Sequence, residues 1–316
     1  MNLVIDIQTI QLVTGTGILL ILATVVGRIM PRFATSEGAT ATVANFQART
    51  RSWWVMVAVF ALAMATGGIG SIILFGLTSF FALREFITQT STKAADHRSL
   101  FWAFFVITPL QYYLIYVQWY GLFALLIPVY AFLFIPVRMA IAGDCENFME
   151  RLAKIQWGIM LCVFCISHIP AILMLDLAGY EGQNAKLLFW LVLVVQISDV
   201  LQYVFGKTLG RHAIAPKVSP NKTWEGFWGG TLAATGIGAA LWWVTPFTPL
   251  QAAGMAFIVN LLGFGGGLTM SAIKRDRGIK DFGNMIGGHG GMLDRLDSLC
   301  FAAPIFFHVT RFYFSN

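Results

Sequence analysis

The stretch LLFWLVLVVQISDVLQYVFG, residues 187–206, decides the fold class of this chain. A helix needs about 20 mostly apolar residues to cross the hydrocarbon core of a bilayer. This stretch has that length, with Asp199 as its one charged side chain. Its apolar positions form a continuous run, unlike the stripe that marks one face of a soluble helix. The stretch therefore predicts a membrane-spanning helix.

The composition of the whole chain also indicates a membrane protein. Of its 316 residues, 57% are hydrophobic and 11% are charged, whereas a soluble domain carries about 25% charged residues. So few charges leave too little polar surface to cover a water-soluble globule of this size. The four cysteines complete no zinc or disulfide pattern, and the first residues lack the basic segment of a cleaved signal peptide.

Ten apolar runs follow one another along the chain, and each is a candidate span. They cover Thr9–Met30, Trp53–Thr66, Ile69–Ile87, Leu100–Val117, Tyr120–Arg138, Ile155–Leu175, Leu187–Gly206, Gly226–Pro246, Leu250–Ile273 and Leu296–Phe312. The second run is short, and Gly67–Gly68 is a weak break before the third, so nine spans are an alternative. We expect an all-α polytopic membrane protein that forms a single integral membrane domain over residues 1–316.

The basic residues predict how this helical protein is oriented. When successive loops are assigned to alternate sides of the membrane, 19 of the 21 Lys and Arg residues fall on one side. Only Lys186 and Arg311 fall on the other side. Loops rich in Lys and Arg face the cytoplasm. Both termini are therefore predicted to lie on the non-cytoplasmic side.

The segment Ser198–Gly226 is the first of two regions that orientation alone does not explain. Asp199 lies inside the seventh run, close to its predicted cytoplasmic end. A carboxylate in lipid is costly unless something pairs with it, so a functional role is the default interpretation. A structural ion pair with Lys207 is the alternative.

The loop after the seventh run has the residues of a phosphate site. It carries Lys207, Arg211, Lys217 and Lys222, with glycines at positions 206 and 210. Backbone N–H groups at glycine turns can approach a phosphate, and basic side chains supply charge. Ser219 followed by Pro220 predicts an N-cap with proline at the first helical position. That helix would direct its N-terminus at a bound anion.

The segment Ser271–Asp297, SAIKRDRGIKDFGNMIGGHGGMLDRLD, is the second region. Its charged residues are Lys274, Arg275, Asp276, Arg277, Lys280, Asp281, Asp294, Arg295 and Asp297. Carboxylates hold a hard cation such as Mg²⁺, and basic residues hold the phosphates that the cation bridges. Asp294 and Asp297 are three residues apart, so a helix would place them on one face. The pattern predicts a site for a metal–nucleotide complex.

Two questions stay open within this segment. His289 lies between two glycine pairs, and its roles as metal ligand, general base, phosphate donor or turn residue are not separated by the pattern. A solvated loop that binds anionic lipid head groups is an alternative for the whole segment. That alternative explains the basic residues, but it does not explain the carboxylates and glycines packed between them.

The second segment closely resembles the signature of the phosphatidate cytidylyltransferase (CDP-diacylglycerol synthase) family. The matching positions are Ser271, Ile273, Lys274, Arg275, Lys280, Asp281, Gly283, His289, Gly290, Gly291, Asp294, Arg295, Leu296 and Asp297. The first segment is similar to the family's upstream segment at Asp199, Tyr203, Gly206, Pro216, Ser219, Pro220, Lys222, Thr223, Trp224, Glu225 and Gly226. The sequence departs from the common pattern at Gln202, where many members have alanine, and at Gly287–Gly288, where many have Pro-Gly. The resemblance covers the C-terminal third to two-fifths of the chain.

The resemblance implies an enzyme that transfers the cytidylyl group of CTP to phosphatidic acid and releases pyrophosphate. The lipid phosphate is already ionised, so catalysis would rest on positioning and charge neutralisation. Residues 1–186 would form a membrane scaffold, and residues 187–316 would carry the catalytic helices and loops. The expected setting is a multi-pass protein of a bacterial inner membrane, with its active site facing the cytoplasm.

The resemblance also implies the site residues and partners. The catalytic residues are expected to be Asp199, Lys280, Asp281 and His289, and the substrate-binding residues Lys207, Ser219, Lys222, Lys274, Arg275 and Arg295. The expected Mg²⁺ ligands are Asp199, Asp281, Asp294 and Asp297, and a second, monovalent cation stays open. CTP and phosphatidic acid in the membrane are the expected partners, without nucleic acid, and a homodimer is an open possibility.

Two other functions are weighed against this one. Gln202 adds a polar side chain near the predicted site, which suits a related lipid kinase or a cytidylyltransferase that acts on a different lipid. An ion-coupled transporter would use Asp199 inside the membrane. Transporters often have repeated halves, whereas this chain shows no clear repeat and concentrates its charge in two late loops.

Overall fold

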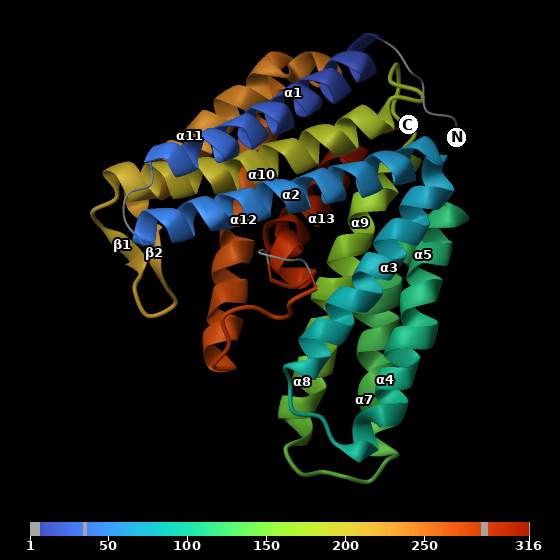
Figure 1. The fold of residues 1–316 in the computed structure, drawn as a ribbon. Coiled ribbons are helices and arrows are strands. Elements are labelled where there is room, and N and C mark those ends of the chain that lie inside the picture. Colours follow the sequence, from blue (N-terminus) through green and yellow to red (C-terminus); the bar gives the residue numbers. More distant parts are fainter. Residues whose placement is uncertain (1–6, 34–36, 286–289, 316) are drawn as a thin grey trace.

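The computed structural model describes residues 7–33, 37–285 and 290–315. Over these residues the chain forms ten helical rods in the order of the ten predicted runs (Figure 1). The uninterrupted rods are α1 (Ile7–Ile29), α2 (Glu37–Ala65), α3 (Gly67–Thr88), α10 (Asn184–Leu209), α11 (Trp224–Ala240), α12 (Pro249–Asp276) and α13 (Leu293–Phe314). The predicted all-α architecture is confirmed.

Three rods are composite, because a π-helical segment interrupts each of them. They are α4–η3–α5 (His97–Trp102, Ala103–Ile107, Thr108–Tyr116), α6–η4–α7 (Tyr120–Leu125, Leu126–Ala131, Phe132–Ala140) and α8–η5–α9 (Phe148–Ile159, Met160–Cys165, Ile166–Ala171). The described residues also form short 3₁₀ segments and one hairpin: η1 (Met30–Phe33), η2 (Ala94–Asp96), η6 (Ile172–Met174), η7 (Trp242–Val244), β1 (Ala213–Ala215) and β2 (Ser219–Thr223).

Seven helices among the described residues are long and apolar enough to cross a membrane, so the chain is an integral membrane protein. They are Ile7–Arg32, Gly67–Thr88, Ala94–Tyr116, Tyr120–Ala140, Phe148–Met174, Asn184–Leu209 and Pro249–Asp276. The remaining three predicted spans lie on α2, α11 and α13. Charged residues precede the apolar half of α2 and begin α13, while α11 has only 17 residues. Composition alone therefore supports these three less strongly.

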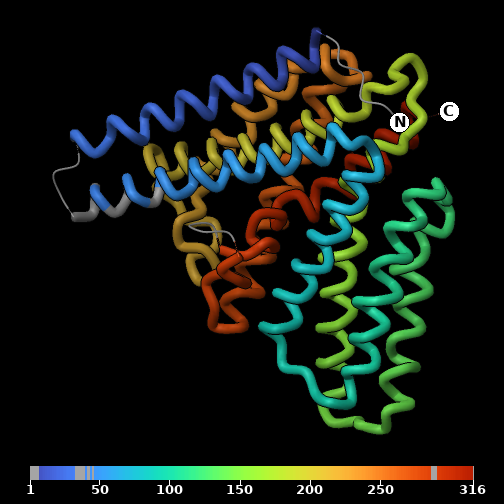
Figure 2. The backbone as a smooth tube through the Cα atoms, turned by 45° about the vertical axis from the view of Figure 1, so that its right-hand side comes forward, coloured from blue at the N-terminus to red at the C-terminus, as the bar shows by residue number. Residues whose placement is uncertain are grey.

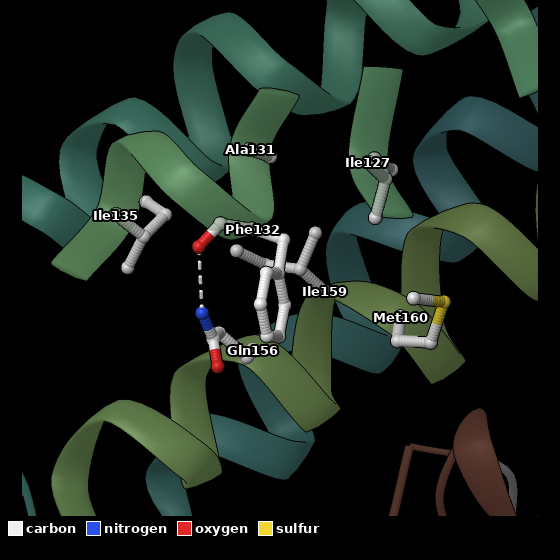
Figure 3. Close-up of a pocket in the computed structure, with 7 residues that line it drawn as sticks. All are labelled: Ile127, Ala131, Phe132, Ile135, Gln156, Ile159 and Met160. Atoms are coloured by element: carbon white, nitrogen blue, oxygen red, sulfur yellow. Dashed lines mark hydrogen bonds between the residues drawn. The ribbon is translucent and has the colours of Figure 1, made fainter. Parts of the chain in front are cut away.

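Pro136 interrupts the backbone hydrogen bonding of α7. In α7, Pro136 has no N–H to donate to the carbonyl of Phe132. Gln156 on α8 donates its Nε2 to that carbonyl at 2.9 Å, as Figure 3 shows. Gln156 and Phe132 line an apolar pocket between η4, α7, α8 and η5, and none of the predicted site residues lines it.

The helices form two groups that cross steeply, as Figures 1 and 2 show. Helices α1, α2, α10 and α11 run along one another, while the rods from α3 to α9 form a second, elongated bundle. Helix α13 lies at the junction, because it packs against α10 and α12 and also against α3, η5 and α9. Its Phe306 stacks on Trp190 of α10 at 5.7 Å between ring centroids, and both side chains are fully buried. The predicted division at residue 186 stays a prediction.

Both ends of the described chain lie at the same end of the molecule. Gln8 near the start of α1 donates to the carbonyl of Trp243 at 3.2 Å and accepts from Lys186 Nζ at 2.5 Å. Leu177 forms a β-bridge with Ser315, just beyond α13. The termini therefore gather with the loops after η6 and η7, as alternate loop assignment predicts. Which side of the membrane this end faces stays a prediction.

Helices α10 and α11 approach closely because α11 presents glycines to α10. A methyl group on Gly230 would lie 2.4 Å from the backbone N of Gln202, and one on Gly226 would lie 2.7 Å from the Gln202 carbonyl oxygen. Small residues four apart let helix backbones pack at short range in membranes. These contacts hold the start of α11, and the hairpin before it, against α10.

Gly230→Ala should therefore destabilise the protein, even though alanine favours helix. Forcing extra volume into a packed interface costs about 1–3 kcal/mol, more than the gain of about 1 kcal/mol from replacing a helical glycine. The midpoint of thermal unfolding of the purified protein in detergent should fall. Gly236→Ala on the same helix is the control, since its methyl would meet nothing within 4 Å. Equal midpoints for the two variants would contradict the prediction.

Candidate active site

The carboxylate inside the seventh predicted span meets helix α13. Ser298 donates its Oγ–H to Asp199 Oδ2 at 2.8 Å. The backbone N–H of Ser298 donates to Oδ1 of its neighbour Asp297 at 2.8 Å. The charges of Asp199 and Asp297 lie close enough to interact. Carboxylates from α10 and α13 therefore converge around one serine.

Lys222 brings a positive charge to these carboxylates from strand β2. Its ammonium lies 4.6 Å from the ring centroid of Phe264 on α12 and interacts electrostatically with Asp297 and Asp199. Burial lowers the pKa of Lys222 below that of an ordinary lysine. A partly buried ammonium beside carboxylates is poised to exchange these partners for a phosphate.

Glycines of α12 make room for this arrangement. A methyl group on Gly266 would lie 2.4 Å from the carbonyl oxygen of Asp297. A methyl group on Gly267 would lie 2.9 Å from Lys222 Nζ, 3.7 Å from Ser298 Oγ and 3.9 Å from Asp297 Oδ2. Three polar atoms thus surround the space left by the missing side chain of Gly267. We call Asp199, Lys222, Gly267, Asp297 and Ser298 the central cluster.

The predicted N-cap at Ser219 is wrong. Ser219 lies in β2 opposite Ala215, and the following proline is tolerated because both strands of a two-stranded hairpin are edge strands. Helix α11 begins at Trp224, and its cap is Thr223, whose Oγ1 accepts a hydrogen bond from Gly226 N at 3.2 Å. Pairing within the hairpin, with Ala215 only four residues earlier, overrides the Ser-Pro signal.

The contacts of Gly206, Gly210 and Lys207 also differ from those predicted from the sequence. A methyl on Gly206 would lie 3.3 Å from Thr223 Oγ1, and one on Gly210 would lie 2.7 Å from the same atom. These glycines therefore let the hairpin pack against α10. Lys207 is exposed, with its ammonium 5.9 Å from the ring centroid of Tyr203. The alternative in which Lys207 is the ion-pair partner of Asp199 is not what the structure forms.

Asp294 holds together the segments on either side of the glycine-rich stretch. Its Oδ1 accepts from Lys274 Nζ on α12 at 2.9 Å. Its Oδ2 accepts from Phe282 N at 2.8 Å and Gly291 N at 2.9 Å. The carboxylate is buried, and such a group is stable only when charged and N–H partners satisfy it. Asp294 therefore links the end of α12, the loop and the start of α13.

The remaining predicted residues surround the central cluster. Arg295 interacts electrostatically with Asp297, Asp294 and Asp281, and its buried Nε has no hydrogen-bond partner among the described residues. Arg275 joins the hairpin turn to the loop by donating to Val218 O at 3.3 Å and Ile279 O at 3.1 Å. Lys280 and Asp281 are exposed. His289 and the departure at positions 287–288 lie outside the described residues.

Two carboxylates of the central cluster fit a hard cation. Mg²⁺ is typically bound by one or two carboxylates together with substrate phosphates and water, and Asp199 and Asp297 supply such oxygens beside the Ser298 hydroxyl. Asp294 suits this role less, because its oxygens are engaged by Lys274 and two N–H groups. Over the described ranges, no group of three or more His, Cys, Asp or Glu side chains is placed to hold a metal.

Sequence reasoning missed three residues that the structure brings to this region. Ser298 and Gly267 are revealed only when α10, α12 and α13 are seen together. Glu85 on α3 is buried and accepts hydrogen bonds from the start of α13. It lies inside the third apolar run, so the same rule that marked Asp199 as a carboxylate within a membrane span also applies to Glu85.

Known proteins resemble this chain over most of its length. A model of the cytidylyltransferase family matches residues 47–313. The uncharacterized protein YnbB of Escherichia coli (strain K12) is 38% identical over 299 residues, which cover 93% of this chain and 95% of that protein. A phosphatidate cytidylyltransferase of Staphylococcus aureus (strain COL) is 29% identical over 265 residues, 81% of this chain and 96% of that protein. Another, of Aquifex aeolicus (strain VF5), is 37% identical over 139 residues, 44% of this chain and 52% of that protein.

Proposed function

Because this chain belongs to the cytidylyltransferase family, we propose that it makes CDP-diacylglycerol and pyrophosphate from CTP and phosphatidic acid. The observation that carries the proposal is the central cluster, in which Asp199, Asp297 and Ser298 meet Lys222 at the junction of α10, α12 and α13. Relatives named phosphatidate cytidylyltransferase support this choice of lipid.

The proposed reaction needs an aligned nucleophile and neutralised charge. A phosphate oxygen of phosphatidic acid attacks the α-phosphorus of CTP, a new P–O bond forms, and the bond to the bridging oxygen breaks as pyrophosphate leaves. The nucleophile is already an anion, so no residue needs to remove a proton. The protein then has to hold two negatively charged substrates together and stabilise the charge on the leaving group.

The cluster residues divide this work. Lys222 would contact the triphosphate, and Arg295 would offer its unpartnered Nε to a substrate phosphate. Asp199 and Asp297 would hold Mg²⁺, which would neutralise charge on the triphosphate. Ser298 fixes the carboxylate of Asp199 through its hydroxyl. Lys274 is already paired with Asp294, so its proposed role is to hold the loop beside the substrates.

The position of the cluster suits these substrates. It lies in the second half of α10 and the first turns of α13, away from the two termini, on the side whose loops carry most of the Lys and Arg residues. The positive-inside rule supports the proposal that this side faces the cytoplasm, where CTP is available. Phosphatidic acid would present its phosphate at the membrane surface while its acyl chains stay in lipid. The proposed location in a bacterium is therefore the inner membrane.

The direct test is a pyrophosphate-release assay with purified protein in detergent micelles. The protein should release pyrophosphate from CTP only when phosphatidic acid and Mg²⁺ are both present, and CDP-diacylglycerol should accumulate in equal amount. A panel of other lipid phosphates and polyprenols tests the alternative acceptors. CTP turnover with none of these lipids, together with ion flux in liposomes, would favour a transporter over the proposed enzyme.

The panel of lipid acceptors also tests whether Gln202 selects the lipid. The side chain donates Nε2 to Ser198 Oγ at 2.9 Å and packs where a methyl on Gly230 would lie. Because it fills the interface between α10 and α11, we propose that it supports helix packing and does not select the lipid. Gln202→Ala should then leave the order of preference among the acceptors unchanged.

Gly267→Ala should impair turnover through Lys222. The new methyl would lie 2.9 Å from Lys222 Nζ, so the ammonium has to shift from its place in the central cluster. A misplaced catalytic group can cost about 100-fold, and we expect the kcat for CDP-diacylglycerol formation to fall by about that factor. Gly265→Ala is the matched control, because its methyl would meet nothing within 4 Å. Equal kcat values for both variants would contradict this role of the space beside Gly267.

A further inference from the structure

The N-terminal bundle contributes a buried carboxylate to the start of helix α13. Glu85 on α3 is only 7% exposed. Its Oε1 accepts from Met292 N and its Oε2 from Leu293 N, both at 3.0 Å. The first N–H groups of a helix lack partners within the helix, and a negative charge there also interacts favourably with the helix dipole. Glu85, on α3, therefore accepts hydrogen bonds from these N–H groups and also places a negative charge at the start of α13.

Two glycines leave the space that this carboxylate fills. A methyl on Gly291 would lie 2.4 Å from Glu85 Oε2, and one on Gly283 would lie 2.6 Å from Glu85 Oε1. Asp294 binds Gly291 N on the adjoining side. The two carboxylates therefore take up the N–H groups of three consecutive residues, Gly291, Met292 and Leu293. Acidic side chains therefore hold these three N–H groups at the start of α13.

Helix α3 is a firm support for this contact. Phe86, next to Glu85, packs its ring 6.1 Å from that of Phe282. Gln89, one turn further on, donates Nε2 to the Phe282 carbonyl at 3.1 Å. A methyl on Gly158 of α8 would lie 2.9 Å from the Phe86 ring, so this turn of α3 is wedged between α8 and the loop. The end of α3 thus holds both segments that adjoin Asp294.

We propose that Glu85 is a positioning residue for the reaction. By fixing the first turn of α13, it sets Asp297 and Ser298, which lie one turn further along, against Asp199 and Lys222. This inference rests on the proposed function. It makes the N-terminal bundle part of the active-site framework, because a side chain of α3 determines where the catalytic carboxylate of α13 lies. Loss of the contact should affect alignment more than substrate affinity, since Lys222 is held by β2 and α12.

The experiment compares Glu85→Gln, Glu85→Asp and the control Glu150→Gln. Glu150 is an exposed glutamate on α8 that pairs with Lys154, and an ion pair with a solvent-exposed member contributes little. In Glu85→Gln, the amide keeps one oxygen but turns an NH₂ donor toward an N–H group. Its kcat should fall about 10- to 100-fold, the usual effect of losing a supporting hydrogen bond at a site. Its KM for CTP should stay within about threefold of the wild-type value.

Two measurements show whether Glu85 positions the start of α13 or only stabilises the fold: the activity of Glu85→Asp and the rate of amide hydrogen exchange. Glu85→Asp keeps the charge on a shorter side chain, so its kcat should lie between those of Glu85→Gln and the wild type. Hydrogen exchange at Met292 and Leu293 should accelerate in Glu85→Gln, while the unfolding midpoint and the Glu150→Gln control stay close to the wild type. A kcat for Glu85→Gln within about twofold of the wild-type value overturns the proposal.

Two further outcomes are also decisive. If the Glu85 variants fail to fold, Gly283→Ala keeps the charge but moves the carboxylate, since its methyl overlaps Oε1. An unchanged kcat in that variant would overturn the proposal, and a fall in kcat at constant KM would support it. If the wild-type protein does not turn over CTP, the proposed function fails. Amide exchange in Glu85→Gln then decides alone whether Glu85 holds the start of α13.

Discussion

Asp199→Asn should lower the kcat for CDP-diacylglycerol formation by roughly 10²- to 10³-fold, the effect of removing one well-placed electrostatic group from an active site. Asparagine has the same shape, and its amide oxygen can still accept the hydroxyl of Ser298. What is lost is the negative charge that faces Lys222 and, in the proposed reaction, Mg²⁺. The measurement is CDP-diacylglycerol formed by purified protein at saturating CTP and phosphatidic acid.

Two comparisons show whether this effect belongs to the site. Asp176→Asn removes an exposed carboxylate near the opposite end of the molecule and should leave kcat unchanged. Ser298→Ala removes the hydrogen bond to Asp199 but leaves the charge, so its loss should be smaller than that of Asp199→Asn. The Mg²⁺ concentration for half-maximal activity should rise in Asp199→Asn. Full turnover in a folded Asp199→Asn protein would remove Asp199 from the mechanism.

The sequence predicts features that depend on one segment at a time. The seventh run was expected at Leu187–Gly206 and forms α10, Asn184–Leu209. A length of apolar sequence is enough to predict such a helix, and the polar ends extend beyond the hydrocarbon core. Asp199 could be recognised for the same reason, because a carboxylate within an apolar run is costly wherever the run packs. The family signature then predicted the chemistry without giving the geometry.

Features that depend on two distant segments could not be read in this way. The Ser-Pro pair at residue 219 fails for a more local reason: it suggests a helix cap, but the hairpin that pairs Ser219 with Ala215, four residues earlier, places it in a strand. Asp297 is a carboxylate whose charge interacts with that of Asp199, because α13 packs on α10. Gly267 is one of several glycines on α12, and the approach of Lys222, Ser298 and Asp297 distinguishes it. The catalytic and metal roles of these residues stay predictions.

Asp294→Asn should cost both stability and activity, because it breaks a buried charge pair. Lys274 and Asp294 have side chains that are 13% and 2% exposed, with Nζ and Oδ1 2.9 Å apart. Removing one member of a buried pair costs about 3–5 kcal/mol, since the other charge is left without a partner. The unfolding midpoint in detergent should fall clearly, and turnover should be lost with it.

Asp276→Asn is the matched control for this prediction. Asp276 is an exposed carboxylate on the same helix as Lys274, and it pairs with its neighbour Arg277. Exposed pairs contribute about 0–1 kcal/mol, so the control should melt close to the wild type and keep its activity. If Asp294→Asn melts at the same temperature as Asp276→Asn, the buried pair does not hold the loop.

A double variant separates the structural role of this pair from the chemistry. Replacing both partners of a buried pair with apolar groups is often neutral for stability, so Lys274→Met combined with Asp294→Leu should recover the part of the lost melting temperature that the unpaired Lys274 ammonium causes. Activity should not recover, because the N–H groups of Phe282 and Gly291 lose their acceptor and the start of α13 is no longer set against α12. A double variant that recovers stability and turnover together would show that Asp294 serves only to neutralise Lys274.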